Sequence, residues 1–170
     1  SRARTFGTEK VLGSRSSIRT VTDDLVYAMQ RIYQGRDLDF DLSQLRSCWF
    51  KGESQDLEEM MGNLIDNACK WARKRVRFEL ERDPEALRIT VEDDGAGIPE
   101  DHLASVFDPF FTTKEVGVGT GLGLSVTYGI IQNHHGSIEV KSKVDSGTTF
   151  SIYLPRSSDD GAKHSATDQP

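Results

Sequence analysis

The segment VRFELERDPEALRITV at residues 76–91 decides the fold class of this chain. Apolar residues alternate with polar ones at positions 76, 78 and 80, and again at positions 87, 89 and 91. Between the two runs stands Asp83-Pro84-Glu85, a typical turn sequence. Period-two alternation on both sides of a turn predicts a β-hairpin in which each strand buries one face.

The other elements follow from the same periodicities on either side of this hairpin. Apolar residues at helical spacing predict helices over residues 23–34, 56–75, 100–106 and 122–134. Alternation predicts strands over 38–42, 47–51, 137–143 and 148–154. Hairpins exclude a doubly wound parallel sheet, which needs strands and helices in alternation. The order predicts an α+β fold: a two-layer α/β sandwich with a mixed, mostly antiparallel sheet packed on three helices.

Composition limits both the domain plan and the class of partner. The chain has 170 residues, 36% of them apolar, which is enough for one domain with a full core. We expect a linker over 1–19, the domain over 20–155, and a disordered polar tail over 156–170. The expected linker is rich in basic side chains. The alternative to a solvated linker is an arm that contacts phosphates or a membrane. The net charge of -6 argues against a nucleic-acid-binding protein.

Cysteine usage and hydropathy bear on location. Cys48 and Cys69 are too few for a disulfide framework and lie in no zinc-binding spacing, so we expect both to be reduced and packed. The apolar runs are too short to span a bilayer, and no signal peptide is apparent at the start. The sequence predicts a cytoplasmic domain without membrane contact of its own.

A first polar cluster lies on the predicted helix 56–75. Asn63, Asn67 and Lys70 stand at i, i+4 and i+7 and therefore project from one face. Amide oxygens are ligands for Mg²⁺, and an ammonium group neutralises phosphate, so this face suits a magnesium-bound polyphosphate. A solvated helix face is the alternative. Lys70, Arg73, Lys74 and Arg77 also predict a basic stripe on this helix, either solvated or docking a partner.

Two further clusters are rich in glycine. Asp93 ends a predicted strand before Gly95 and Gly97, and its carboxylate could accept a hydrogen bond from an exocyclic amine such as that of adenine. A plain turn is the alternative there. Residues 117–125, GVGTGLGLS, open a predicted helix, where exposed backbone N–H groups form an anion site or a flexible hinge. They match neither the Walker A motif nor the dinucleotide fingerprint.

The order of these motifs carries a resemblance. NxxxNAxK at 63–70, DxGxG at 93–97, FDPFF at 107–111 and GxGxGLG at 117–123 resemble the N, G1, F and G2 boxes of the ATP-binding catalytic domain of bacterial sensor histidine kinases. Gly147-Thr148 resembles the final Gly-Thr element of that domain. The resemblance covers residues 20–155, and its first half is most similar to PhoQ-type kinases.

The resemblance implies a role for individual residues. Asn67, with Asn63, would ligate Mg²⁺, and Lys70 would contact phosphate. Asp93 would bind the adenine amine, and Lys114, in an ATP lid over 108–120, would reach the γ-phosphate. The other implied nucleotide contacts are Trp71, Gly95, Gly97, Ile98, Gly119, Thr120, Gly121, Leu122, Gly123, Leu124 and Thr148.

The resemblance also implies a reaction and partners. ATP and Mg²⁺ would be the cofactors, and the γ-phosphate would pass to a histidine on a separate dimeric helical domain, with a response regulator as the indirect partner. None of His102, His134, His135 and His164 stands in an acceptor motif, so we expect the acceptor outside this chain. Without the dimerising helices we expect the isolated chain to be a monomer, and the resemblance implies a membrane-anchored full-length kinase. We expect His134 and His135 to cap a helix.

Two rival functions stay open. Related gyrase B and MutL ATPases carry a glutamate base where this chain has Asn63, which cannot accept a proton at neutral pH. Glu59, one turn earlier, is the remaining candidate base for a hydrolytic ATPase. A non-catalytic ATP-binding scaffold is the second rival.

Overall fold

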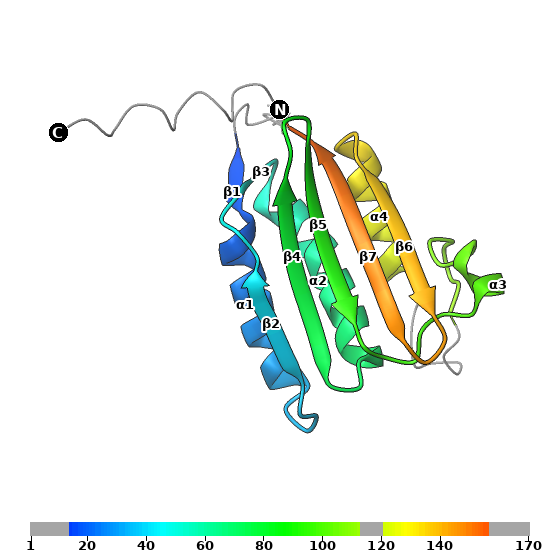
Figure 1. Cartoon of the computed structure of the whole chain (residues 1–170). Coiled ribbons are helices and arrows are strands. Elements are labelled where there is room, and N and C mark those ends of the chain that lie inside the picture. The colour runs from blue at the N-terminus through cyan, green and yellow to red at the C-terminus, as the bar shows by residue number, and fades with distance from the viewer. Residues whose placement is uncertain (1–13, 113–120, 157–170) are drawn as a thin grey trace, which may run out of the picture.

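The chain folds into a sheet with helices on one face, in a computed structural model that describes residues 14–112 and 121–156 (Figure 1). The sheet has five strands in the order β2-β4-β5-β7-β6. β2 pairs with β4 in parallel, and the other neighbours are antiparallel. The strands are β2 (Asp39–Gln44), β4 (Arg75–Arg82), β5 (Ala86–Asp93), β6 (Ser137–Lys143) and β7 (Gly147–Pro155). The predicted mixed, mostly antiparallel sheet is confirmed.

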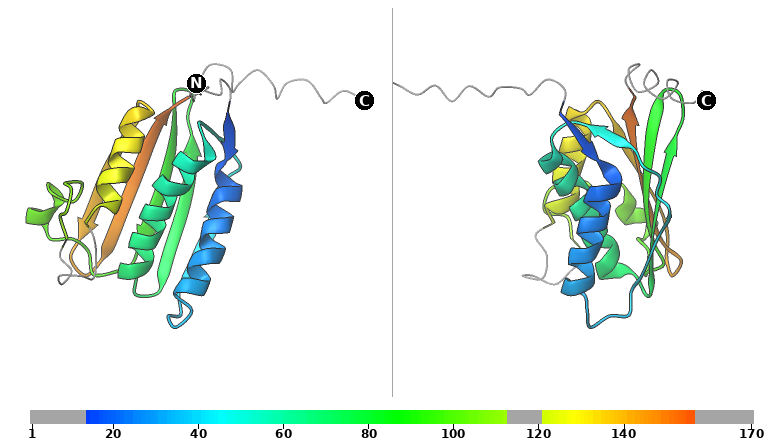
Figure 2. Two further views of the ribbon diagram at one scale, coloured as in Figure 1. Left: turned by 180° about the vertical axis from the view of Figure 1, so that it is seen from behind. Right: turned by 90° about the vertical axis from the view of Figure 1, so that its left-hand side faces the viewer.

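Three long helices cover one face of this sheet (Figure 2). They are α1 (Ile18–Ile32), α2 (Ser54–Trp71) and α4 (Gly123–Asn133), and the short helix α3 (Glu100–Leu103) lies beside β6. α2 packs between α1 and α4. No helix among the described residues is long and apolar enough to span a bilayer.

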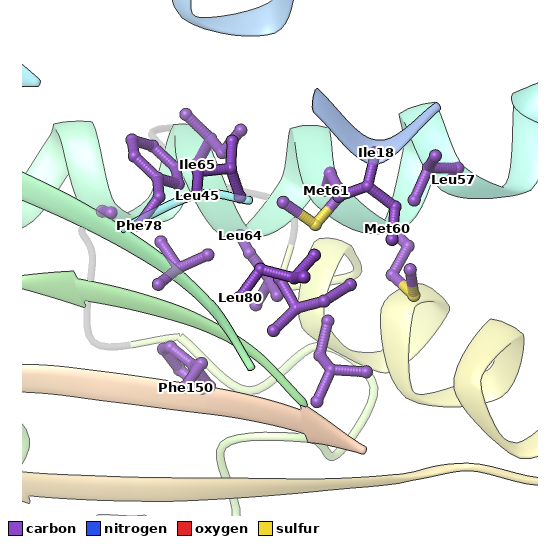
Figure 3. Packing of buried hydrophobic residues seen from close by; sticks show 14 of the residues in the cluster. Ile18, Leu45, Leu57, Met60, Met61, Leu64, Ile65, Phe78, Leu80 and Phe150 are labelled. Atoms are coloured by element: carbon purple, nitrogen blue, oxygen red, sulfur yellow. The ribbon is translucent and has the colours of Figure 1, made fainter. Parts of the chain in front are cut away.

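The core fills the space between helices and sheet (Figure 3). Buried side chains of α2 meet alternate residues of the central strands, such as Phe78, Leu80 and Phe150, all at most 2% exposed. The apolar positions that predicted the 76–91 hairpin therefore form the floor of the core, and the polar ones face away from it.

The folded part begins earlier than residue 20, where we expected the domain to start. β1 (Arg15–Ser17) pairs antiparallel with β3 (Trp49–Lys51) in a separate two-stranded sheet. Ser17 then caps α1 by accepting a hydrogen bond from the N–H of Thr20, and Ile18 is fully buried. Residues 15–19 thus belong to the fold, because their backbone and side chains are paired and packed.

The prediction of a helix over 56–75 was wrong at its carboxyl end. α2 ends at Trp71, Ala72 is extended, and β4 begins at Arg75. Lys70, Arg73, Lys74 and Arg77 consequently form no helical stripe: Arg73 and Lys74 lie in the connection, and Arg77 lies in β4. The cause is a pair of charged side chains that bind the backbone at this connection, described below.

Candidate nucleotide-binding site

A cavity of about 310 Å³ lies between α2, the turn after β5, the segment around residues 106–112, the start of α4 and β7. Segments far apart in the sequence meet here. Among the predicted site residues, those that line the cavity are Asn63, Asn67, Lys70, Trp71, Gly97, Ile98, Gly121, Gly123, Leu124 and Thr148.

Asn63 joins α2 to α4. Its amide nitrogen donates to the carbonyl oxygen of Gly123 at 3.0 Å and lies 3.2 Å from the hydroxyl oxygen of Thr127, which is fully buried. A carbonyl oxygen can only accept, so these contacts fix which end of the amide is nitrogen. The side-chain oxygen of Asn63 is therefore left as an acceptor.

Lys70 forms an ion pair with a residue that sequence reasoning missed. Its ammonium nitrogen lies 2.8 Å from a carboxylate oxygen of Asp66, which also lines the cavity. The other oxygen of Asp66 accepts a hydrogen bond of 2.7 Å from the hydroxyl of Tyr33, at the end of α1. Burial, together with this hydrogen bond, raises the pKa of Tyr33 well above its usual range. The i, i+4 spacing of Asp66 and Lys70 could have predicted their pairing; nothing local predicts Tyr33.

Arg36 holds the carboxyl end of α2. Its guanidinium donates to the carbonyl oxygens of Cys69, at 2.6 Å, and Lys70, at 3.1 Å, and also to that of Ala72. The last carbonyls of a helix lack partners within it, and a cation there also opposes the helix dipole. Arg36 thereby ends α2 immediately after Lys70 and Trp71.

Asp94 holds the same connection from the opposite side. One of its carboxylate oxygens accepts hydrogen bonds from the backbone N–H groups of Arg73, Lys74 and Arg75, at 2.9 to 3.0 Å. Burial alone would raise the pKa of Asp94, but these three donors outweigh burial and lower it. The turn after β5 is thus joined to the end of α2.

Asp93, at the end of β5, is not one of the residues that line the cavity, but its strand partner Thr148 is. The Asp93 side chain is 4% exposed and accepts hydrogen bonds from the backbone N–H of Gly95, at 2.9 Å, and of Thr148. Burial raises the pKa of Asp93 to about 6, the neighbouring Asp94 adds to the rise, and the two N–H groups oppose it. The result is a buried carboxyl group that still ionises at neutral pH.

The glycines of the turn are required by the protein's own backbone. A Cβ atom on Gly95 would lie 2.1 Å from the carbonyl oxygen of Trp71. At Gly97, where φ is +75°, it would lie 2.1 Å from that of Lys143. Gly97 also lines the cavity, whereas Gly95 does not.

A hydroxyl network that sequence reasoning missed connects this turn to the β6–β7 hairpin. Ser142 accepts from the N–H of Ile98 at 2.7 Å, and its hydroxyl lies 2.8 Å from that of Thr148. Ser142 also lies 2.9 Å from the carbonyl oxygen of Gly147. Thr148, only 5% exposed, is thereby fixed beside Asp93, its partner across β5 and β7.

Phe110 and Phe111, which lie in the predicted lid over 108–120, have different surroundings. Phe110 has a φ of 65° and is 72% exposed, whereas Phe111 packs edge-on against the ring of His102 and lines the cavity. Leu122 is the N-terminal flanking residue of α4 and is not a lining residue. Three predicted residues, Lys114, Gly119 and Thr120, lie outside the described residues.

The His134 ring has contacts that sequence reasoning missed. The backbone N–H of His134 bonds to carbonyls of the last turn of α4, whereas capping by the two imidazole rings stays a prediction. The ring nitrogen Nε2 of His134 lies 3.0 Å from a carboxylate oxygen of Asp56, and the ring packs on Phe50. No histidine is among the described residues that line the cavity.

Residues 52–158 match the family of histidine kinase-, DNA gyrase B- and HSP90-like ATPases. Sensor kinase CckA of Brucella abortus is 39% identical over an alignment that covers 84% of this chain and 17% of that protein. Virulence sensor histidine kinase PhoQ of Salmonella typhimurium is 30% identical over 82% of this chain and 28% of its own length. The chain therefore spans less than a third of either relative.

Solved structures show the same fold. The mycobacterial sensor histidine kinase MprB superposes with a TM-score of 0.73 at 26% identity, covering 85% of this chain and 97% of that one. The catalytic domain of histidine kinase ThkA gives a TM-score of 0.72 at 23% identity, covering 84% and 95%. The predicted α+β sandwich is confirmed by both.

Proposed function

Because the chain belongs to the family of histidine kinase-, DNA gyrase B- and HSP90-like ATPases, we propose that it is the ATP-binding catalytic domain of a sensor histidine kinase. It would bind Mg-ATP in the cavity and transfer the γ-phosphate to a histidine on a separate helical domain. The observation that carries this proposal is that Asn63, Asn67 and Lys70 line one cavity together with the start of α4 and with Thr148, the strand partner of the buried Asp93.

The adenine end of the site is proposed at Asp93. A carboxylate held by two backbone N–H groups keeps acceptor capacity for the exocyclic amine of adenine. Thr148 stands beside it, and Trp71, 39% exposed at the end of α2, lines the same cavity and would contact the nucleotide. Ile98 supplies an apolar side chain to the cavity lining, and Gly97 supplies backbone of the turn after β5.

The phosphate end is proposed at α2 and the start of α4. Lys70 would neutralise phosphate charge, and Gly121, Gly123 and Leu124 border the start of α4, where the first N–H groups of a helix have no acceptor within the helix itself. Lys114, Gly119 and Thr120 remain proposed phosphate contacts from the sequence.

The donor set fits a magnesium ion bound together with phosphates. Asn63 keeps its side-chain oxygen as an acceptor because its nitrogen is occupied, and Asn67 lines the same cavity. Among residues 14–112 and 121–156, no cluster of three or more His, Cys, Asp or Glu could hold a metal by itself. Amide oxygens would then supply part of the coordination and the phosphates the rest. Mg²⁺ would supply charge neutralisation between the phosphates.

The chain's own residues favour transfer over hydrolysis. Asn63 cannot accept a proton from water, and Glu59 is exposed and not among the described lining residues. Phosphoryl transfer needs little covalent help from the protein; it needs the phosphate oriented and its charge stabilised. We assign both tasks to Lys70 and the start of α4, which line the same cavity.

The acceptor and further partners are proposed outside the described fold. The segment preceding β1 would lead to a dimeric helical domain that carries the acceptor histidine, and a response regulator would receive the phosphate from it. Full-length anchoring in the inner membrane belongs to the same proposal. The absence of a histidine from the described cavity lining supports an external acceptor.

Calorimetric titration tests the binding proposal. ADP and an unhydrolysable ATP analogue are titrated into the wild type, Asp93→Asn and Glu92→Gln, with and without Mg²⁺. Glu92 is the matched control because it neighbours Asp93 but is exposed. We expect Asp93→Asn to weaken binding at least tenfold, which corresponds to about 1.4 kcal/mol or more of binding free energy. Glu92→Gln should leave the affinity unchanged. No binding by the wild type would contradict the proposal.

Transfer is tested with γ-labelled ATP and a purified histidine-containing helical domain. Label on the acceptor histidine without steady phosphate release by the isolated chain is the expected result. Steady turnover without an acceptor would instead favour the hydrolytic ATPase, and binding without either reaction would favour a scaffold.

A further inference from the structure

Asp66 and Lys70 are the charged residues among the described residues that line the cavity. Their ion pair of 2.8 Å means that an incoming polyphosphate meets a cation already accompanied by an anion. Asp66 also directly precedes Asn67, the proposed magnesium ligand. A fixed negative charge therefore stands at the phosphate end of the site.

The Asp66 carboxylate is held from two helices. One oxygen contacts Lys70 on α2, and the other accepts from the hydroxyl of Tyr33 on α1 at 2.7 Å. Burial and this hydrogen bond raise the pKa of Tyr33, so its hydroxyl stays protonated and remains a donor at neutral pH. The carboxylate cannot turn away from an arriving phosphate without losing a partner.

We propose that Asp66 makes nucleotide binding depend on a divalent cation, by repelling metal-free polyphosphate more strongly than the magnesium complex. The inference rests on the proposed nucleotide site. Coulomb energy scales with the product of the charges, and ADP carries about three negative charges when free but about one as its Mg²⁺ complex. The same carboxylate therefore opposes free ADP about three times as strongly.

The expected size follows from that difference in charge. Over a separation of about 7 Å in a water-like dielectric, two extra charges correspond to about a tenfold change in affinity. Asp66 thus sets a selectivity ratio: the dissociation constant of ADP in excess EDTA divided by that in saturating Mg²⁺.

Asp66→Asn is the principal test, measured by calorimetry with ADP under both conditions. We expect the selectivity ratio to fall about tenfold, mainly because metal-free ADP binds more tightly. Asp66→Glu, which keeps the charge, retains most of the wild-type ratio. Glu58→Gln removes one negative charge from an exposed position two turns earlier on α2 and leaves the ratio unchanged. An unchanged ratio in Asp66→Asn, with ADP still bound by the wild type, would overturn the inference.

Two further measurements separate charge from folding and geometry. Adenosine lacks phosphates, so its affinity for Asp66→Asn should equal that for the wild type if the variant is correctly folded. Tyr33→Phe removes the hydrogen bond but not the charge, and its ratio should stay near the wild-type value; a tenfold fall there would overturn the charge account. Absence of ADP binding by the wild type would overturn the proposed function itself, and this inference with it.

Discussion

The guanidinium of Arg36 donates a hydrogen bond of 2.6 Å to the carbonyl oxygen of Cys69, one residue before Lys70. With its bonds to the carbonyls of Lys70 and Ala72, this contact ties the loop between α1 and β2 to the end of α2. A residue far from the cavity in sequence thus fixes the turn of helix on which Lys70 and Trp71 stand.

Arg36→Ala should therefore loosen this end of α2. We expect a loss of about 1.5 kcal/mol in the free energy of unfolding, at the low end for charged hydrogen bonds because Arg36 is exposed. Amide hydrogen exchange at residues 70–75 should accelerate. Arg31→Ala, near the end of α1 and 6.0 Å from the ring of Tyr27, is the control. Equal exchange rates in the two variants would contradict the capping role.

Asp94→Ala should cost more than Arg36→Ala. The substitution leaves three backbone N–H groups without their shared acceptor, and we expect a loss of about 2 kcal/mol in urea-induced unfolding. Asp94→Asn keeps one acceptor oxygen in the same place and should cost about half as much. Equal losses in the two variants would show that the hydrogen bonds are not the cause.

Asp93 should make the nucleotide-free protein more stable as the pH falls. Its folded pKa of about 6 lies above the unfolded value near 4, so the folded state binds the proton more tightly. The unfolding free energy of the wild type, relative to Asp93→Asn, should rise by roughly 2 kcal/mol between pH 7 and pH 4. Urea titrations of both proteins across this range measure it. A difference independent of pH would contradict a raised pKa.

Gly95→Ala should disrupt both stability and the site. The added Cβ would lie 2.1 Å from the carbonyl oxygen of Trp71 and 2.8 Å from a carboxylate oxygen of Asp93, so either the turn or the end of α2 must move. We expect a loss of about 2 kcal/mol or more, with weaker ADP binding. A Cβ atom added at Gly129 in α4 would meet no atom within 4 Å apart from the nearby backbone of its own helix. Gly129→Ala should therefore stabilise the protein by about 0.5 to 1 kcal/mol. Thermal unfolding of both variants distinguishes the cases.

The bounds of helices and strands were predicted most accurately where the local sequence pattern determines them. The strands expected over 137–143 and 148–154 agree with β6 and β7 to within one residue, because alternation and a Ser-Gly turn mark their ends. The end of α2 was mispredicted for the opposite reason. Residues 72–75 carry no local helix breaker; Arg36 and Asp94, distant in sequence, take the backbone groups that a longer helix would use.

In the candidate site, too, local spacing predicted some residues, whereas contacts between distant segments were missed. Motif spacing found the residues that share a face or a turn, such as Asn63 with Asn67, and the structure brings them to one cavity. Spacing could not find Tyr33, whose contact with Asp66 spans 33 residues, or Ser142, whose contact with Ile98 spans 44. These partners depend on how α1 lies beside α2 and how β6 lies near the turn.

The strand order also dictates when the cavity can be completed during synthesis. β7 is the last strand in the part of the chain that the structure describes, yet it lies inside the sheet, between β5 and β6. Until the ribosome has released residues 147–155, β5 is an open edge, and Asp93 lacks the neighbouring N–H of Thr148. The five strands therefore form one continuous sheet only after residues 147–155 dock, and the Asp93 carboxyl gains its second backbone donor in that same step.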